Sequence, residues 1–210
     1  MPVYRIGKWC QRHGVLYTKY GTPTGRRLKR KDDYQWEHNL VTELVRNNAQ
    51  HPGLLRAIEW LDQFFPPEDA TRVKPTVQPE VSAESRRALT STFLRISPQG
   101  VTPLDVIIET AALWLVSAWR QRELDDGLAL TQHLGTAVIY LGVNDTEVVY
   151  VNGKRSRRPK RIAFLTRHTI GAAIRGAMGV LLLNIAHACV AKVERDDQAK
   201  HDLRKPFNIT

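Results

Sequence analysis

One segment of this chain is apolar around most of its circumference if it forms a helix. Residues 104–123 carry a nearly continuous apolar surface, made of Val106, Ile107, Leu113, Trp114, Leu115, Val116 and Trp119. Thr102 can cap this helix, and Pro103 suits its first position, so the sequence predicts where the helix begins. A helix with apolar residues on most sides must be surrounded by other elements in water. We therefore expect a fold built around a central, buried helix.

Helical patterns on both sides of this segment can supply the surrounding elements. Apolar residues recur at helical spacing after Asp32 and again after Pro52, which predicts a helical hairpin over residues 32–66. Further helices are expected over residues 82–96, 126–141 and 162–194, the last as one long helix or two. The large aromatic residues at helical spacing are expected in the core, namely Trp36, Trp60, Phe64, Phe65, Trp114 and Trp119. A docking patch formed by Phe64 and Phe65 is the alternative.

Prolines and a turn dipeptide divide the chain. Four prolines between residues 66 and 82 predict an extended linker over residues 67–82. The β-branched run 146–151 leads into Asn152-Gly153, which favours a tight hairpin turn and predicts a β-hairpin near residues 146–162. The predicted fold class is mainly α. It comprises a basic arm (1–31), a helical hairpin (32–66), the linker, and a helical domain with one basic β-hairpin (83–210).

Charge is distributed unevenly along the chain, whose net charge is +10. Residues 1–31 hold nine Lys and Arg with no acidic side chain, and residues 151–175 hold eight with none. Residues 32–150 hold seventeen acidic and nine basic side chains. Two purely cationic segments beside an acidic body can concentrate positive potential on separate patches, and such patches suit the phosphates of nucleic acid.

We therefore expect a non-enzymatic nucleic-acid-binding protein, of the kind that phages and plasmids encode, with DNA or RNA as partner. The candidate binding residues of the arm are Arg26, Arg27, Lys29, Arg30 and Lys31. Those of the second segment are Lys154, Arg155, Arg157, Arg158, Lys160, Arg161 and Arg167. The alternative is a structural or regulatory protein module, such as a phage inhibitor or a virion component, that binds an acidic protein surface.

A short N-terminal pattern bears on metal binding. Trp9, Cys10 and His13, followed by the run 19–23 (KYGTP), resemble a segment of small zinc-knuckle proteins encoded by phages and mobile elements. The resemblance covers about residues 9–31 and implies a zinc role for Cys10 and His13. The upstream cysteine pair that would complete four ligands is missing, so we expect no metal.

Catalysis is not expected, and neither is a cofactor. Asp145, Glu147 and Lys154 are the best match to a metal-dependent nuclease core, which makes this activity a third interpretation. Asn152 stands two residues before the lysine, where such a core requires Asp, Glu or Gln. The hairpin turn predicted at Asn152-Gly153 already accounts for the asparagine.

The two cysteines and the absence of an apolar leader favour a cytoplasmic protein with no membrane segment. The longest uncharged runs are interrupted by polar residues and glycines. Small residues between Gly171 and Gly179 allow close helix contact and make a homo-oligomer possible.

Overall fold

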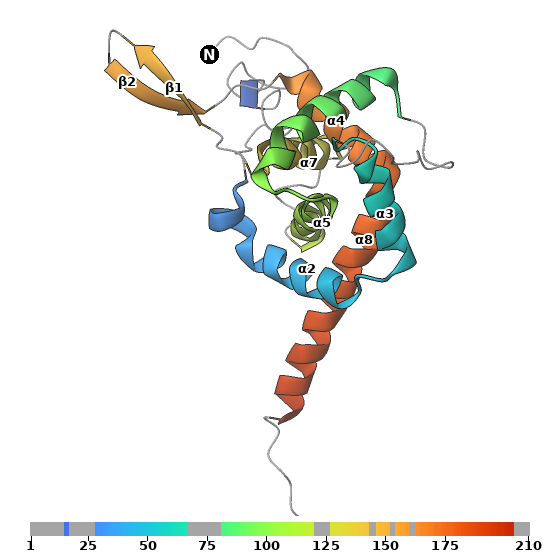
Figure 1. The fold of residues 1–210 in the computed structure, drawn as a ribbon. Helices are drawn as coiled ribbons and strands as arrows, with labels where there is room; N and C mark the ends of the chain where they lie inside the picture. The colour runs from blue at the N-terminus through green and yellow to red at the C-terminus, as the bar shows by residue number, and fades with distance from the viewer. Residues whose placement is uncertain are drawn as a thin grey trace, which may run out of the picture.

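The computed structural model describes residues 15–16, 28–66, 81–119, 127–142, 146–151, 154–159 and 163–203. Most of these residues are helical (Figure 1). The helical elements are the π-helical turn η1 (Arg30–Tyr34), α2 (Gln35–Asn47), α3 (Pro52–Asp62), α4 (Ala83–Ile96), the 3-10 turn η2 (Ser97–Gln99), α5 (Pro103–Trp119), α7 (Gly127–Tyr140) and α8 (Phe164–Leu203). The expected helices are thus confirmed, and α8 is a single continuous helix.

Local capping explains where three of these helices begin. The His51 ring accepts a hydrogen bond from the Gly53 amide (3.1 Å), and Pro52 opens α3. Ser82 Oγ accepts from the Ser85 amide (3.2 Å) at the start of α4. Thr102 and Asp105 cap α5 reciprocally, because Asp105 Oδ2 accepts from the Thr102 amide (2.8 Å) while Thr102 Oγ1 accepts from the Asp105 amide (3.3 Å).

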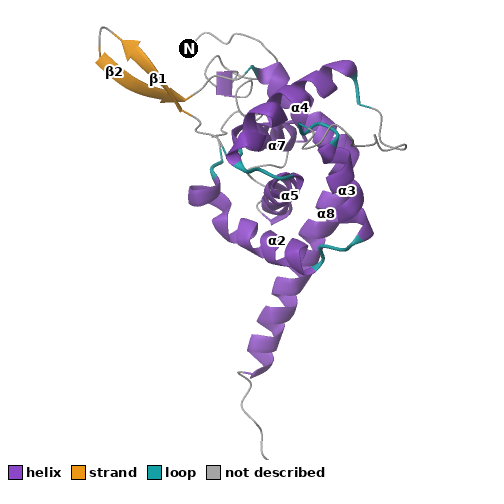
Figure 2. Ribbon diagram, viewed as in Figure 1, coloured by secondary structure: helices purple, strands orange, loops and turns teal. Residues whose placement is uncertain are grey.

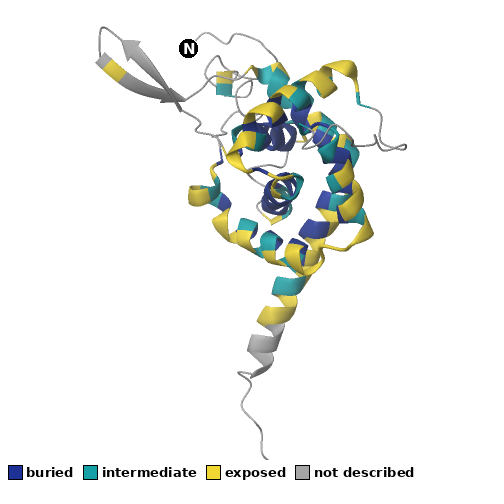
Figure 3. Cartoon of the chain, in the orientation of Figure 1, coloured by how far each residue is buried: buried dark blue, intermediate teal, exposed yellow. Residues whose placement is uncertain are grey.

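Helix α5 lies at the centre of the helical body (Figure 1). Helices α2, α3, α7 and α8 pack directly against it, and α4 packs on α7 and α8. Every residue from Val106 through Leu113 is buried. Figure 3 shows this helix as the most continuously buried element in view, together with α7. The expectation of a central, buried helix is confirmed.

Helices α7 and α8 approach each other so closely that their backbones touch. A Cβ atom on Gly135 would lie 1.9 Å from the carbonyl oxygen of Arg167. A Cβ atom on Gly171 would lie 1.9 Å from the carbonyl oxygen of Thr131. No side chain fits at either position, so these two glycines set the distance between the helices. Part of the small-residue stretch of α8 is therefore used within the chain.

The aromatic residues predicted for the core differ in burial, and Phe65 and Trp114 are partly buried. Trp60 and Phe64 are buried, as expected, and Phe65 stacks on Phe93 with ring centroids 4.5 Å apart. For Trp36 and Trp119 the expectation of core packing is wrong, because these side chains are 52% and 37% exposed. Both lie at helix ends, in the first turn of α2 and at the last residue of α5, where the surrounding helices no longer cover them.

The predicted fold class is wrong in its architecture, because no strand takes part in the helical domain that the structure describes. The backbone of β1 (Thr146–Val151) pairs antiparallel with that of β2 (Lys154–Pro159), with Val149 opposite Ser156. These strands pack chiefly against each other and extend away from the helices (Figure 2). The hydrophobic core among the described residues is formed by helices and the turns between them. A two-stranded ribbon is marginally stable alone, and its return strand, KRSRRP, brings no large apolar residue to such a core.

Helices α2 and α3 share one core with the helices of the segment 83–210. Helices α2 and α3 pack against α5 and α8, and their buried residues Val41, Val45, Leu54 and Leu61 belong to the same core. The physical reason is the composition of α5, which is apolar on the side that α2 and α3 cover as well as on the side facing α7 and α8.

Helix α8 continues to Leu203, beyond the predicted end at residue 194. Its segment Phe164–Asp197 is long and apolar enough, by length and composition alone, to cross a membrane, and 28% of its most apolar window is buried in the protein. Helices α4 and α5 would meet the same criterion only as one span bent by 108°. Core helices of soluble proteins also meet it, so the cytoplasmic location stays a prediction.

Candidate functional site

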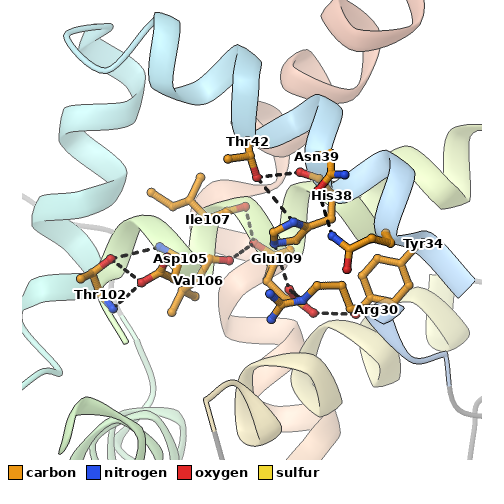
Figure 4. Close-up of polar contacts among 12 residues, drawn as sticks. Arg30, Tyr34, His38, Asn39, Thr42, Thr102, Asp105, Val106, Ile107 and Glu109 are labelled. Atoms are coloured by element: carbon orange, nitrogen blue, oxygen red, sulfur yellow. Dashed lines mark hydrogen bonds and ion pairs between the residues drawn. The ribbon is translucent and has the colours of Figure 1, made fainter. Parts of the chain in front are cut away.

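The most unusual side chain of the central helix is Glu109, a carboxyl group that is 4% exposed among apolar neighbours. The Tyr34 hydroxyl donates a hydrogen bond of 2.6 Å to its Oε1 atom. The Arg30 Nε atom lies 2.9 Å from its Oε2 atom and forms an ion pair with it. Figure 4 shows these two side chains, both from η1, converging on Glu109. A buried carboxyl group is tolerated when it is paired in this way.

Two opposing effects act on the charge of Glu109. Burial raises its pKa above the usual value, because desolvation penalises the charged form. The hydrogen bond from Tyr34 and the positive charge of Arg30 act in the opposite direction. The hydrogen bond from Tyr34 and the charge of Arg30 favour the ionised carboxylate, so they offset part of the cost of its burial. Glu109 and η1 therefore depend on each other.

His38 adds a third polar side chain beside this carboxyl group. Its Nε2 atom lies 3.5 Å from Glu109 Oε2, farther away than Arg30 Nε. Burial, and next the charge of Arg30, lower the pKa of His38 to about 4. The Arg30 guanidinium already pairs with the same carboxylate oxygen, so protonation of His38 would place a second cation beside it. His38 is therefore neutral at pH 7.

This arrangement anchors the end of the basic arm to the centre of the protein. Arg30 and Tyr34 are four residues apart on η1, so both reach Glu109 from one side. Glu109 was not among the residues predicted to form a site. The available signal was a single carboxylate inside the apolar run 106–116, because an acid at such a place requires a partner.

A pocket of about 220 Å³ opens beside the anchor. Its polar lining comes from Arg30, His38, Thr42, Arg46 and Asp105. This volume is below the roughly 300–1,000 Å³ of typical small-molecule sites. The lining also mixes two guanidinium groups with a carboxylate, so it does not define one class of ligand.

The predicted binding residues lie in different settings. Lys29, Lys31 and Arg155 are exposed, and the Arg30 side chain is 39% exposed while it pairs with Glu109. Arg167 is half-buried in the first turns of α8, and its carbonyl group faces Gly135. Lys154, Arg157 and Arg158 belong to β2, but the structure describes only their backbone. The predicted residues Arg26, Arg27, Lys160 and Arg161 lie outside the described residues.

Within the part of the chain that the structure describes, no three His, Cys, Asp or Glu side chains are placed to share a metal ion. Cys10, His13 and Asp145 lie outside that part. Cys189 is buried, and burial raises the pKa of its thiol to about 11. His187, two residues before Cys189 on α8, is exposed.

Comparison of the sequence with known protein families finds no match, and comparisons with curated proteins and with solved structures find none either.

Proposed function

We propose that this protein is a non-enzymatic nucleic-acid-binding protein that contacts backbone phosphates through its two cationic segments. The observation that carries the proposal is the separation of charge, since residues 1–31 and 151–175 contain basic side chains and no acidic ones. Mixed charges would serve solubility alone, whereas segregated cations neutralise phosphates and release their counterions.

The positions of the described cations support this proposal. Lys29 and Lys31 are exposed directly beside the anchor that Arg30 forms with Glu109. The anchor fixes the backbone from which these lysines extend, so less conformational freedom is lost when they bind. Arg155 is exposed on the strand pair that extends from the helices.

Binding of the full-length protein to duplex DNA, single-stranded DNA and RNA tests the proposal when affinity is measured by fluorescence anisotropy at several salt concentrations. We expect affinity to fall steeply with salt. Replacing Lys29, Lys31 and Arg155 by Gln is expected to weaken binding. The same replacement should reduce the logarithmic salt slope by up to about 0.9 for each phosphate that is no longer neutralised.

A matched control removes the same charge elsewhere. Arg56, Arg87 and Arg195 are exposed on α3, α4 and α8, and their replacement by Gln gives an equal change in net charge. If both triple variants lose the same affinity, binding depends only on net charge and the proposed segments are wrong. If the unchanged protein binds no polymer at low salt, nucleic-acid binding is wrong, and an acidic protein surface becomes the better partner.

A further inference from the structure

Two neighbouring tryptophans form an exposed aromatic surface on the helical body. The Trp36 and Trp119 rings are stacked, with centroids 5.0 Å apart and planes at 29°. Their exposed fractions are 52% and 37%, whereas Trp60 in the core is 3% exposed. Large aromatic side chains supply much of the energy of cores and interfaces because they bury so much area. A stacked pair left half in water is therefore a candidate contact surface.

The backbone around each ring is well fixed. Trp36 belongs to the first turn of α2, which continues directly from η1 and its anchor on Glu109. Trp119 is the last residue of the central helix α5. Helices α2 and α5 pack against each other. The two rings are thus presented on a rigid base, and a ligand that stacks on them would require little ordering of the protein.

Positive charge lies close to this pair along the chain. The exposed Lys29 and Lys31 precede Trp36 by seven and five residues. Carboxylates are present as well. Asp33 accepts a hydrogen bond from the Lys29 amide (2.8 Å), which partly occupies it, and Asp32 is exposed. Exposed aromatic rings beside lysines and arginines are the combination that binds single-stranded nucleic acids.

We propose that the Trp36–Trp119 pair is a stacking platform for an unpaired base of single-stranded nucleic acid, whose phosphates contact Lys29 and Lys31. This inference rests on the proposed function. It adds that the helical body prefers single-stranded over double-stranded nucleic acid. In a duplex, each base already stacks on its neighbours and offers no free face. An unpaired base can stack on an indole ring regardless of its sequence. Stacking covers the ring surface that is otherwise exposed to water.

The test compares three replacements of Trp36 in the full-length protein, with a short oligothymidine strand and a duplex of the same length as probes. Trp36→Phe keeps a flat ring, Trp36→Leu keeps apolar cover without a ring, and Trp36→Ala removes both. We expect Trp36→Leu and Trp36→Ala to weaken single-strand binding about 5- to 150-fold, which corresponds to about 1–3 kcal/mol. Trp36→Phe should retain most of the affinity, and duplex binding should change by less than about twofold.

Two controls separate stacking from simple loss of packing or stability. Leu94 on α4 is 55% exposed, and Leu94→Ala removes an exposed apolar side chain away from the tryptophans. It should leave single-strand affinity unchanged. Thermal unfolding of each variant shows whether it remains folded, and the salt dependence of binding should be the same for Trp36→Leu and the unchanged protein, because no cation has been removed.

Failure of this inference differs from failure of the proposed function. If the unchanged protein binds oligothymidine and a folded Trp36→Leu variant binds it equally well, the stacking platform is wrong while phosphate binding stands. Equal losses of affinity for the strand and the duplex also overturn the platform. If the unchanged protein binds neither probe at low salt, the proposed function itself is wrong and the platform falls with it.

Discussion

The contact between α7 and α8 allows a direct prediction about stability. Helix α8 contains one glycine packed against the α7 backbone and another with free space around it. A Cβ atom on Gly171 would lie 1.9 Å from the Thr131 carbonyl oxygen, whereas nothing lies within 4 Å of a Cβ atom on Gly176. Both residues are inside α8, so alanine improves helix propensity equally at the two positions. Only the packing differs between them.

The magnitudes follow from these distances. Real Cβ contacts essentially never fall below 3.0 Å, so Gly171→Ala must push α8 away from α7 by more than about one ångström. Overpacking of this kind costs about 1–3 kcal/mol or more, and the blocking atom belongs to the backbone, which cannot rotate aside. With a cost at the upper end of this range, about 3 kcal/mol, and a gain of about 1 kcal/mol in helix propensity, we expect a net loss of about 2 kcal/mol. Gly176→Ala should instead gain up to about 1 kcal/mol.

Thermal and urea unfolding of the two variants check this prediction. For a chain of 210 residues, each kcal/mol shifts Tm by about 2–4 °C, so the midpoints should move in opposite directions and differ by about 6–12 °C. Gly135→Ala, on the other side of the same contact, should behave like Gly171→Ala. A Gly171→Ala variant that unfolds at or above the midpoint of the unchanged protein would contradict this prediction, since the two helices would then not be in backbone contact.

Three further predictions concern the anchor and the caps. Tyr34→Phe removes a hydrogen bond of 2.6 Å to a buried carboxyl group and should lower the free energy of unfolding by about 1.5–3 kcal/mol in urea titrations; an unchanged midpoint would contradict the anchor. Because the pKa of His38 is lowered to about 4, the native state binds this proton more weakly than the unfolded chain, so stability is lost as pH falls from 6.5 towards 4. NMR titration of the ring should show a neutral His38 at pH 6, and His38→Gln should remove this part of the acid sensitivity; a measured pKa near 6.5 would be inconsistent with the burial. Thr102→Val deletes the cap of α5 and should lower the free energy of unfolding by about 1 kcal/mol, measured by thermal unfolding. Thr90→Val, inside α4, is the control, and an equal loss of stability there would show that the effect does not come from the cap.

Helix positions were predictable because their causes are local. Pro52, Ser82 and the Thr102-Pro103 pair mark helix starts by side-chain and backbone chemistry that acts within three residues, and the structure has helices that begin there. The continuous apolar surface of residues 106–116 likewise required a central helix, whatever surrounded it. The charge separation of the chain, on which the proposed function depends, can be read from the sequence alone.

Tertiary packing decided what these local rules leave open. Periodicity assigned Trp36 and Trp119 the same apolar character as Trp60, but only the arrangement of helices determines which rings are covered, and the first two lie at helix ends in partial contact with water. The pairing of Glu109 with Arg30 joins residues that are far apart in sequence, and no spacing rule predicts such a pair. Helices α2 and α3 belong to the core, and no described strand does. This outcome depends on which elements pack against the apolar faces of α5. Sequence patterns determine the elements through short-range interactions, whereas burial depends on contacts between distant segments that exist only once the chain has folded.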